Sequence, residues 1–167
     1  MFVVVGGHSR NIGKTAVAAA IIRELSDLNW TAVKVTQHGH GICAPVGEPC
    51  GCSIEYEHPF ALSEEQDPTT GTDSARFLAA GALRAYWLRA PVGQLGHAVP
   101  AFRRLLESSE NLIAESNSVL QYFQPDLYLP VLDFGVEDFK DSALKYLDRA
   151  DALVTVGSPR QRTWERV

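Results

Sequence analysis

Short apolar runs alternate along this chain with segments that have helical spacing. The first run, Phe2–Val5, is apolar and rich in β-branched residues, and it ends at a glycine pair, as a buried strand does. Residues 14 to about 28 carry apolar side chains every three or four positions, which predicts a helix with one buried stripe. The stripe consists of Val17, Ile21, Leu25 and Leu28. Asn29 is the expected end of this helix.

The same patterns predict the remaining elements and the class of fold. Strands are expected at 31–36, 83–88, 111–114, 127–132 and 152–156, and helices at 75–80, 94–108, 118–123 and 137–149. Thr72–Ser74 offers caps for the helix at 75–80, and Gly81 ends it. The last helix should bury a face made of Phe139, Ala143, Leu144 and Leu147. Because strands and helices alternate, we predict an α/β fold with a mainly parallel central sheet and helices on both faces.

One segment, residues 37 to about 68, shows neither period. Glycine, proline, cysteine and histidine crowd together there, and only residues 53–57 resemble a short strand. Segments of this length without regular structure are usually functional or disordered when they interrupt a compact domain. We therefore predict a single domain over 1–167 with a Cys/His-rich insertion at about 37–68. The last ten residues are expected to form a tail.

The composition narrows the class of protein. The chain has 167 residues, of which 46% are hydrophobic and 21% charged, as is typical of a globular domain with a substantial core. Its net charge of −5 argues against a broad basic surface for nucleic acid. No apolar run approaches the roughly 20 residues that span a bilayer, and the first strand leaves no room for a signal peptide. We expect a cytoplasmic protein that binds neither nucleic acid nor membrane.

The strongest chemical motif lies between the first strand and the first helix. Gly13-Lys14-Thr15 opens the helix directly after a glycine-bearing loop, which is the context of a phosphate-binding P-loop. Unpaired amides at a helix N-terminus attract anions, Lys14 should reach the terminal phosphates, and the Thr15 hydroxyl should ligate Mg²⁺. The expected nucleotide-binding positions of the loop are Asn11, Ile12, Gly13, Lys14, Thr15 and Ala16. The alternative is that Gly-Lys-Thr merely begins an ordinary helix.

The spacing of this loop departs from the usual motif. In the common pattern the first glycine precedes the second by five residues, and here that position holds His8. Gly7 lies one residue earlier. Either the loop is one residue longer than usual, or His8 adopts the conformation that glycine usually takes.

Polar residues follow several of the predicted strands. His38, Glu115 and Asp133 lie at such ends, and ligands of parallel sheets bind beyond the carboxyl ends of the strands. Glu115 is expected to hold Mg²⁺ directly or through water, and Asp133 to support that site or activate water; the predicted catalytic residues are thus Lys14, Glu115 and Asp133. Each carboxylate could instead be a solvated turn residue. Lys34, within the second strand, either meets a phosphate or ends in solvent, as strand lysines usually do.

Three cysteines and several histidines gather in the insertion. Four such side chains could form a Cys₃His zinc site, and soft thiolates could alternatively receive another metal. The candidate ligands are Cys43, Cys50, Cys52 and His58, with His38 or His40 as alternatives to the histidine. The spacing is not that of a paired CxxC ribbon, so three reduced cysteines in a glycine-rich loop remain the alternative.

Four segments of the chain resemble one known family. They are the loop through Gly13-Lys14-Thr15; the stretch 33–38; Thr72–Arg76 with Ala80-Gly81-Ala82; and Leu112–Glu115. With this order and spacing, the chain resembles the molybdopterin-guanine dinucleotide biosynthesis protein B family, within the signal-recognition and MinD-like class of P-loop NTPases. The similarity covers about residues 2–156. One departure is Ser116-Asn117-Ser118, where the family tends to have glycine.

The resemblance implies a three-layer P-loop NTPase fold and a small protein that binds GTP and Mg²⁺ and forms a homodimer. Such a protein would assist attachment of a nucleotide to the molybdenum cofactor, with a pterin and a partner enzyme nearby, and hydrolyse GTP weakly. Lys14, Thr15 and Glu115 carry over as nucleotide and metal residues, and His38, Asp73 and Arg76 as residues that face the ligand. No Asn-Lys-x-Asp element marks guanine, so GTP rests on the resemblance alone. The alternatives are an ATP-dependent small-molecule kinase and a metal or cofactor carrier without turnover.

Overall fold

The computed structural model describes residues 1–38 and 59–158. In this part of the chain, seven strands form one sheet in the order β3-β4-β2-β5-β1-β6-β7. The strands are β1 (Phe2–Gly7), β2 (Trp30–His38), β3 (Ala61–Glu65), β4 (Arg84–Pro91), β5 (Asn111–Glu115), β6 (Leu127–Asp133) and β7 (Val154–Val156). All neighbours pair in parallel except β3, which is antiparallel to β4. The mainly parallel α/β fold is therefore confirmed.

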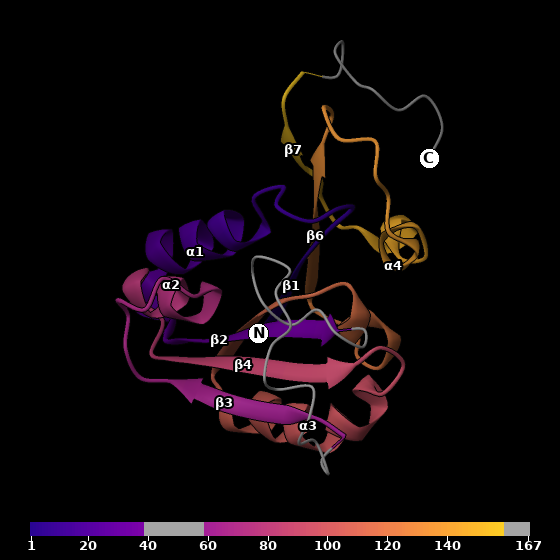
Figure 1. Ribbon diagram of the computed structural model, residues 1–167. Coiled ribbons are helices and arrows are strands. Elements are labelled where there is room, and N and C mark those ends of the chain that lie inside the picture. The colour runs from indigo at the N-terminus through magenta and orange to yellow at the C-terminus, as the bar shows by residue number, and fades with distance from the viewer. Residues whose placement is uncertain (39–58, 159–167) are drawn as a thin grey trace.

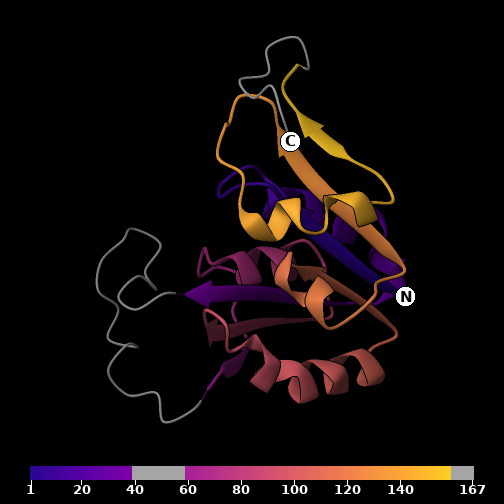
Figure 2. The same ribbon diagram turned by 90° about the vertical axis from the view of Figure 1, so that its right-hand side faces the viewer.

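Helices cover both faces of the sheet. The α-helices are α1 (Lys14–Glu24), α2 (Asp73–Ala79), α3 (Val99–Ser108) and α4 (Asp141–Leu144), and the 3-10 helices are η1 (Ser26–Leu28), η3 (Leu95–Ala98), η4 (Ser118–Gln121) and η5 (Leu147–Arg149). Helices α1 and α2 lie on one side of β2, β4 and β3, and α3 lies on the other (Figure 1). The sheet is strongly twisted, since β6 runs steeply to β2 in both views (Figures 1 and 2).

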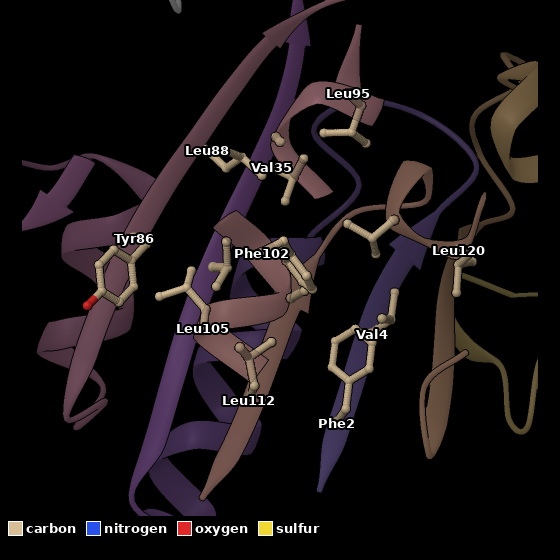
Figure 3. Packing of buried hydrophobic residues seen from close by; sticks show 14 of the residues in the cluster. Phe2, Val4, Val35, Tyr86, Leu88, Leu95, Phe102, Leu105, Leu112 and Leu120 are labelled. Carbon is tan, nitrogen blue, oxygen red and sulfur yellow. The ribbon is translucent and has the colours of Figure 1, made fainter. Parts of the chain in front are cut away.

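Two hydrophobic clusters fill the space between the sheet and its helices, because alternate strand residues point to opposite faces. Val3 and Val5 pack with Ile22 of α1 and Phe77 of α2 on one face. On the other face, Phe2 packs against Phe102 of α3 with the ring centroids 5.9 Å apart. Figure 3 shows this second cluster, which also contains Val4, Val35, Tyr86, Leu88, Leu95, Leu105, Leu112 and Leu120.

Most of the expected helix boundaries are confirmed. The Thr72 side chain caps α2 by accepting the Ala75 amide, and Gly81 follows this helix with a φ of 104°. Helix α1 ends at Glu24, after which η1 continues to Leu28 and Asn29 takes a left-handed φ of 51°. Pro100 lies in the first turn of α3, where a missing N–H costs nothing, so it does not interrupt the helix.

The helix predicted over 137–149 is wrong. Only α4 and the short η5 are helical there, because residues 138–140 instead run along the loop between β1 and α1. The Lys140 amide donates a hydrogen bond to the His8 carbonyl at 2.8 Å, and the Phe139 ring lies against His8 rather than on a helix face. Of the predicted apolar face, Ala143 is buried but Leu144 is 46% exposed.

Strand β3 was not predicted from its sequence. It lies inside the segment expected to be irregular, and its polar residues Ser63, Glu64 and Glu65 hide the apolar signal. Charged residues of this kind are common on edge strands, where they discourage pairing with other chains. The strand expected at 53–57 and the tail expected at the C-terminus lie outside the described residues, apart from Ser158.

Candidate functional site

In the loop between β1 and α1, Gly7 and Gly13 lie one residue further apart than the two glycines of the common P-loop spacing. Asn11 and Gly13 adopt left-handed φ values of 55° and 90°, whereas His8 does not lie in that region. Gly7 holds the place of the first glycine for a steric reason. A Cβ on Gly7 would lie 2.8 Å from Lys14 Cδ and 2.9 Å from Ile12 Cδ1. Of the two interpretations of the spacing, the backbone of His8 does not support the second, and the first stays a prediction.

His8 ties the loop to the segment after β6. Its side chain is fully buried, and its Nε2 accepts the Asp133 amide at 2.9 Å. The proton must therefore reside on Nδ1, which donates to the Asp138 carbonyl at 3.1 Å. The ring lies 4.3 Å from that of Phe139, and burial lowers the pKa of His8, which favours this neutral form. His8 therefore has a structural role, because it connects the loop to the segment after β6.

Two side chains from separate elements contact Glu115, the last residue of β5. Thr15 donates from Oγ1 to Glu115 Oε2 at 2.7 Å, and Lys34 Nζ lies 2.5 Å from Oε1. The sheet register dictates this meeting, since Glu115 is level with Lys34 of β2 and with Val5 of β1. Glu115 is only 3% exposed, so the carboxylate depends on these partners for its charge compensation.

Lys34 also pairs with Asp73 at the start of α2, at 2.7 Å. Burial acts to raise the pKa of the Asp73 carboxyl, but hydrogen bonds from Lys34 and Thr15 and the positive charges of Lys34 and Arg76 hold it below its usual value. The expectation that a strand lysine ends in solvent is wrong here, because the Lys34 side chain is 19% exposed and lies between two carboxylates.

Two further lysines make the site electropositive. Lys14 donates from Nζ to the Ser9 carbonyl at 2.5 Å, and burial, followed by the like charge of Lys140, lowers the pKa of Lys14 to about 8. Burial also lowers the pKa of Lys140, with the charge of Arg10 adding to the effect. Because both ammonium groups are destabilised in the protein alone, a bound polyanion would stabilise both charged forms.

The Asn117 side chain holds the end of β1 through two hydrogen bonds to the backbone of Gly7. Its side-chain oxygen accepts the Gly7 amide and its side-chain nitrogen donates to the Gly7 carbonyl, both at 2.9 Å. A Cβ on Gly6 would collide with the Asn117 side-chain oxygen and lie 2.7 Å from the Tyr128 ring. The sequence drew attention to Asn117 only as a departure from the resembled family, and its role was missed.

The structure brings together some of the predicted site residues and separates others. Lys14, Thr15, Asp73 and Glu115 converge, with Arg76 exposed on α2 near Asp73. Asp133 lies beyond His8, and its Oδ1 accepts the Gly135 amide at 2.8 Å, which stabilises the turn after β6. Its catalytic role stays a prediction. In the loop, Ile12 is buried, whereas Asn11, Gly13 and Ala16 are exposed.

The predicted zinc ligands Cys43, Cys50, Cys52 and His58 lie outside the described residues, as does His40. Within residues 1–38 and 59–158, no group of three or more His, Cys, Asp or Glu side chains is arranged to hold a metal ion. His38 ends β2, half-buried, and its carbonyl accepts the Val92 amide at 3.0 Å. Its predicted ligand contact stays a prediction. None of the helices in the described ranges has the length and apolar character that a bilayer crossing requires.

Comparison with known proteins adds no relatives. No family model matches the chain, no curated protein matches it, and no solved structure matches it.

Proposed function

We propose that the protein binds a nucleoside triphosphate with Mg²⁺ at the loop between β1 and α1. The observation that carries this proposal is the Thr15–Glu115 pair, in which a hydroxyl at the helix start lies 2.7 Å from a carboxylate at a strand end. Both are hard oxygen donors of the kind that Mg²⁺ prefers, so the donor set fits this metal. Thr15 and Glu115 would hold the ion, which when bound supplies charge neutralisation between phosphate oxygens.

The positive side chains then have distinct roles. Lys14 would exchange the Ser9 carbonyl for the terminal phosphates, and the backbone amides after Asn11 would surround them. Lys34 is already engaged by Glu115 and Asp73, so it orients these carboxylates and balances their charge. Lys140 is close enough for its charge to lower the pKa of Lys14, and it would add positive charge on the side of the loop that faces the segment after β6.

We further propose GTP as the nucleotide and assembly of the molybdopterin guanine dinucleotide cofactor as the setting. This part rests on the four segments that resemble the family named above. It implies a weak GTPase, acting as a dimer beside a partner enzyme and a pterin. An ATP-dependent small-molecule kinase is the competing assignment for the same loop, and the base specificity separates the two.

The test is calorimetric titration of the protein with Mg²⁺–GTP and Mg²⁺–ATP at pH 7 and pH 8.5. Phosphate binding favours the charged Lys14, whose pKa is about 8 in the free protein and should rise in the complex. The Lys14 contribution to the affinity is therefore complete below about pH 7 and falls as the pH rises through 8, by about fourfold between the two pH values. The heat of binding should depend on the buffer at pH 8.5, because a proton is taken up.

Selective GTP binding with this pH dependence supports the whole proposal. Preference for ATP would favour the kinase, and no binding of either nucleotide would overturn the assignment of the loop. An affinity that does not change with pH would show that Lys14 does not contact the phosphates.

A further inference from the structure

The face of the sheet that carries Lys34 also carries Arg89, which lies closer to the carboxyl ends of the strands. Lys34 of β2 is level with Trp87 of β4, and Thr36 is level with Arg89. Because side chains alternate along a strand, these four residues point to the same face. The Trp87 Nε1, which donates to Thr36 Oγ1 at 3.0 Å, is consistent with this placement.

Arg89 is held in a defined orientation but is incompletely paired. Its guanidinium stacks on Trp87, with Cζ 4.5 Å from the ring centroid, and its Nη2 donates weakly to Ser63 Oγ at 3.4 Å. The Arg89 Nε is shielded from solvent and has no hydrogen-bond partner among the described residues. A shielded N–H without a partner is unfavourable, and a guanidinium presents Nε and one terminal nitrogen together as a fork for an oxyanion.

Arg84, on the same strand, shows how such a fork is normally filled. Its guanidinium also lies over an aromatic ring, that of Tyr86, at 5.1 Å. Its Nε and Nη2, however, donate to the two carboxylate oxygens of Glu64 at 2.8 and 3.0 Å. Arg84 therefore has an internal carboxylate, whereas Arg89 has a hydroxyl at the limit of hydrogen bonding. The group that would complete Arg89 is an oxyanion.

We propose that Arg89 binds the carboxylate or phosphate of a second, small anionic ligand beside the nucleotide site. Arg89 lies one strand and two residues away from Lys34, which corresponds to roughly 8 Å between their backbones. A ligand of metabolite size is long enough to span this separation. The stacking on Trp87 and the Trp87–Thr36 hydrogen bond orient the guanidinium before binding, which reduces the ordering cost. This inference goes beyond the nucleotide proposal and does not depend on it.

The test uses NMR titrations of the whole protein with sodium phosphate and, separately, sodium malonate at constant ionic strength. The indole N–H of Trp87, assigned with a Trp87→Phe variant, reports on Arg89, and the Gly13 amide reports independently on the loop. We expect the Trp87 signal to shift with saturation. Arg89→Gln should weaken this binding at least about tenfold, because a charged hydrogen-bonding fork is lost. Arg84→Gln, the matched control, should leave it unchanged.

The remaining outcomes are separable. Saturation with phosphate alone or malonate alone assigns the ligand class, and saturation with both supports a general oxyanion site. A Trp87 signal that does not saturate with either anion, or that responds equally in Arg89→Gln, overturns the proposal. If Arg89→Gln proves unstable, Arg89→Lys takes its place. This variant keeps the charge without the fork, so it should bind with intermediate affinity. A Gly13 amide that fails to respond would count against the P-loop assignment and leave the Arg89 result intact.

Discussion

Replacing Lys14 with alanine should weaken binding of Mg²⁺–GTP by about 10- to 150-fold while leaving the fold intact. The loss follows from removing the lysine that we propose contacts the terminal phosphates directly, and hydrogen bonds to charged groups contribute about 1.5–3 kcal/mol each. The stability of the free protein should stay the same or increase, since burial already disfavours the Lys14 ammonium. Calorimetry measures the affinity, and thermal unfolding followed by circular dichroism measures the stability.

Lys145→Ala is the control for this experiment. Lys145 is exposed, and its ammonium lies 5.3 Å from the Tyr146 ring centroid, outside the groups that line the loop. The control variant should bind nucleotide as the native protein does. Equal affinity of the Lys14→Ala variant and the native protein would show that the motif does not bind phosphate, and Gly13-Lys14-Thr15 would then only begin a helix.

Replacing Lys34 with methionine should lower the free energy of unfolding by about 3–5 kcal/mol. The change leaves the carboxylate of Glu115, whose side chain is 2% exposed, without its closest positive charge, and removal of one partner from a buried pair has this cost. For a domain of this size the melting temperature should fall by about 10 °C. Urea unfolding at pH 7 measures the difference.

Two further variants identify the cause of that loss. Lys34→Met combined with Glu115→Gln should recover part of the stability, because no charge is left buried without a partner. Arg84→Met removes an exposed ion pair with Glu64 from the same sheet and should cost no more than about 1 kcal/mol. If Lys34→Met loses no more stability than Arg84→Met, Glu115 does not depend on Lys34, and the proposed charge balance is wrong.

The elements of the fold were largely predictable because their signals are local. The β-branched run of β1, the glycine pair and Gly13-Lys14-Thr15 occur within fifteen residues and specify strand, loop and helix together. The alternation of strands and helices then indicated a parallel sheet, whose geometry places Glu115 at the same edge as the loop. Strand β3 escaped prediction because its edge position allows three polar residues to follow its single apolar pair.

The partners within the site could not be predicted from the sequence. The contacts of Lys34 with Glu115 and Asp73 depend on strand register and on the packing of α2, which no spacing in the sequence encodes. The same is true of His8, whose contacts lie about 130 residues away in the chain. Periodicity over 137–149 gave a wrong helix because Phe139 and Lys140 contact the loop instead of a helix face.

The position of β1 has a consequence for how the chain folds. The first strand lies between β5 and β6, so both of its neighbours are made more than 100 residues later. During synthesis, Val3, Val4 and Val5 have no sheet partners until the ribosome has made most of the chain. Contacts of such long range slow folding and expose apolar segments to association in the meantime. A strand inside the finished sheet therefore stays unpaired longer than any other early strand while the chain is being made.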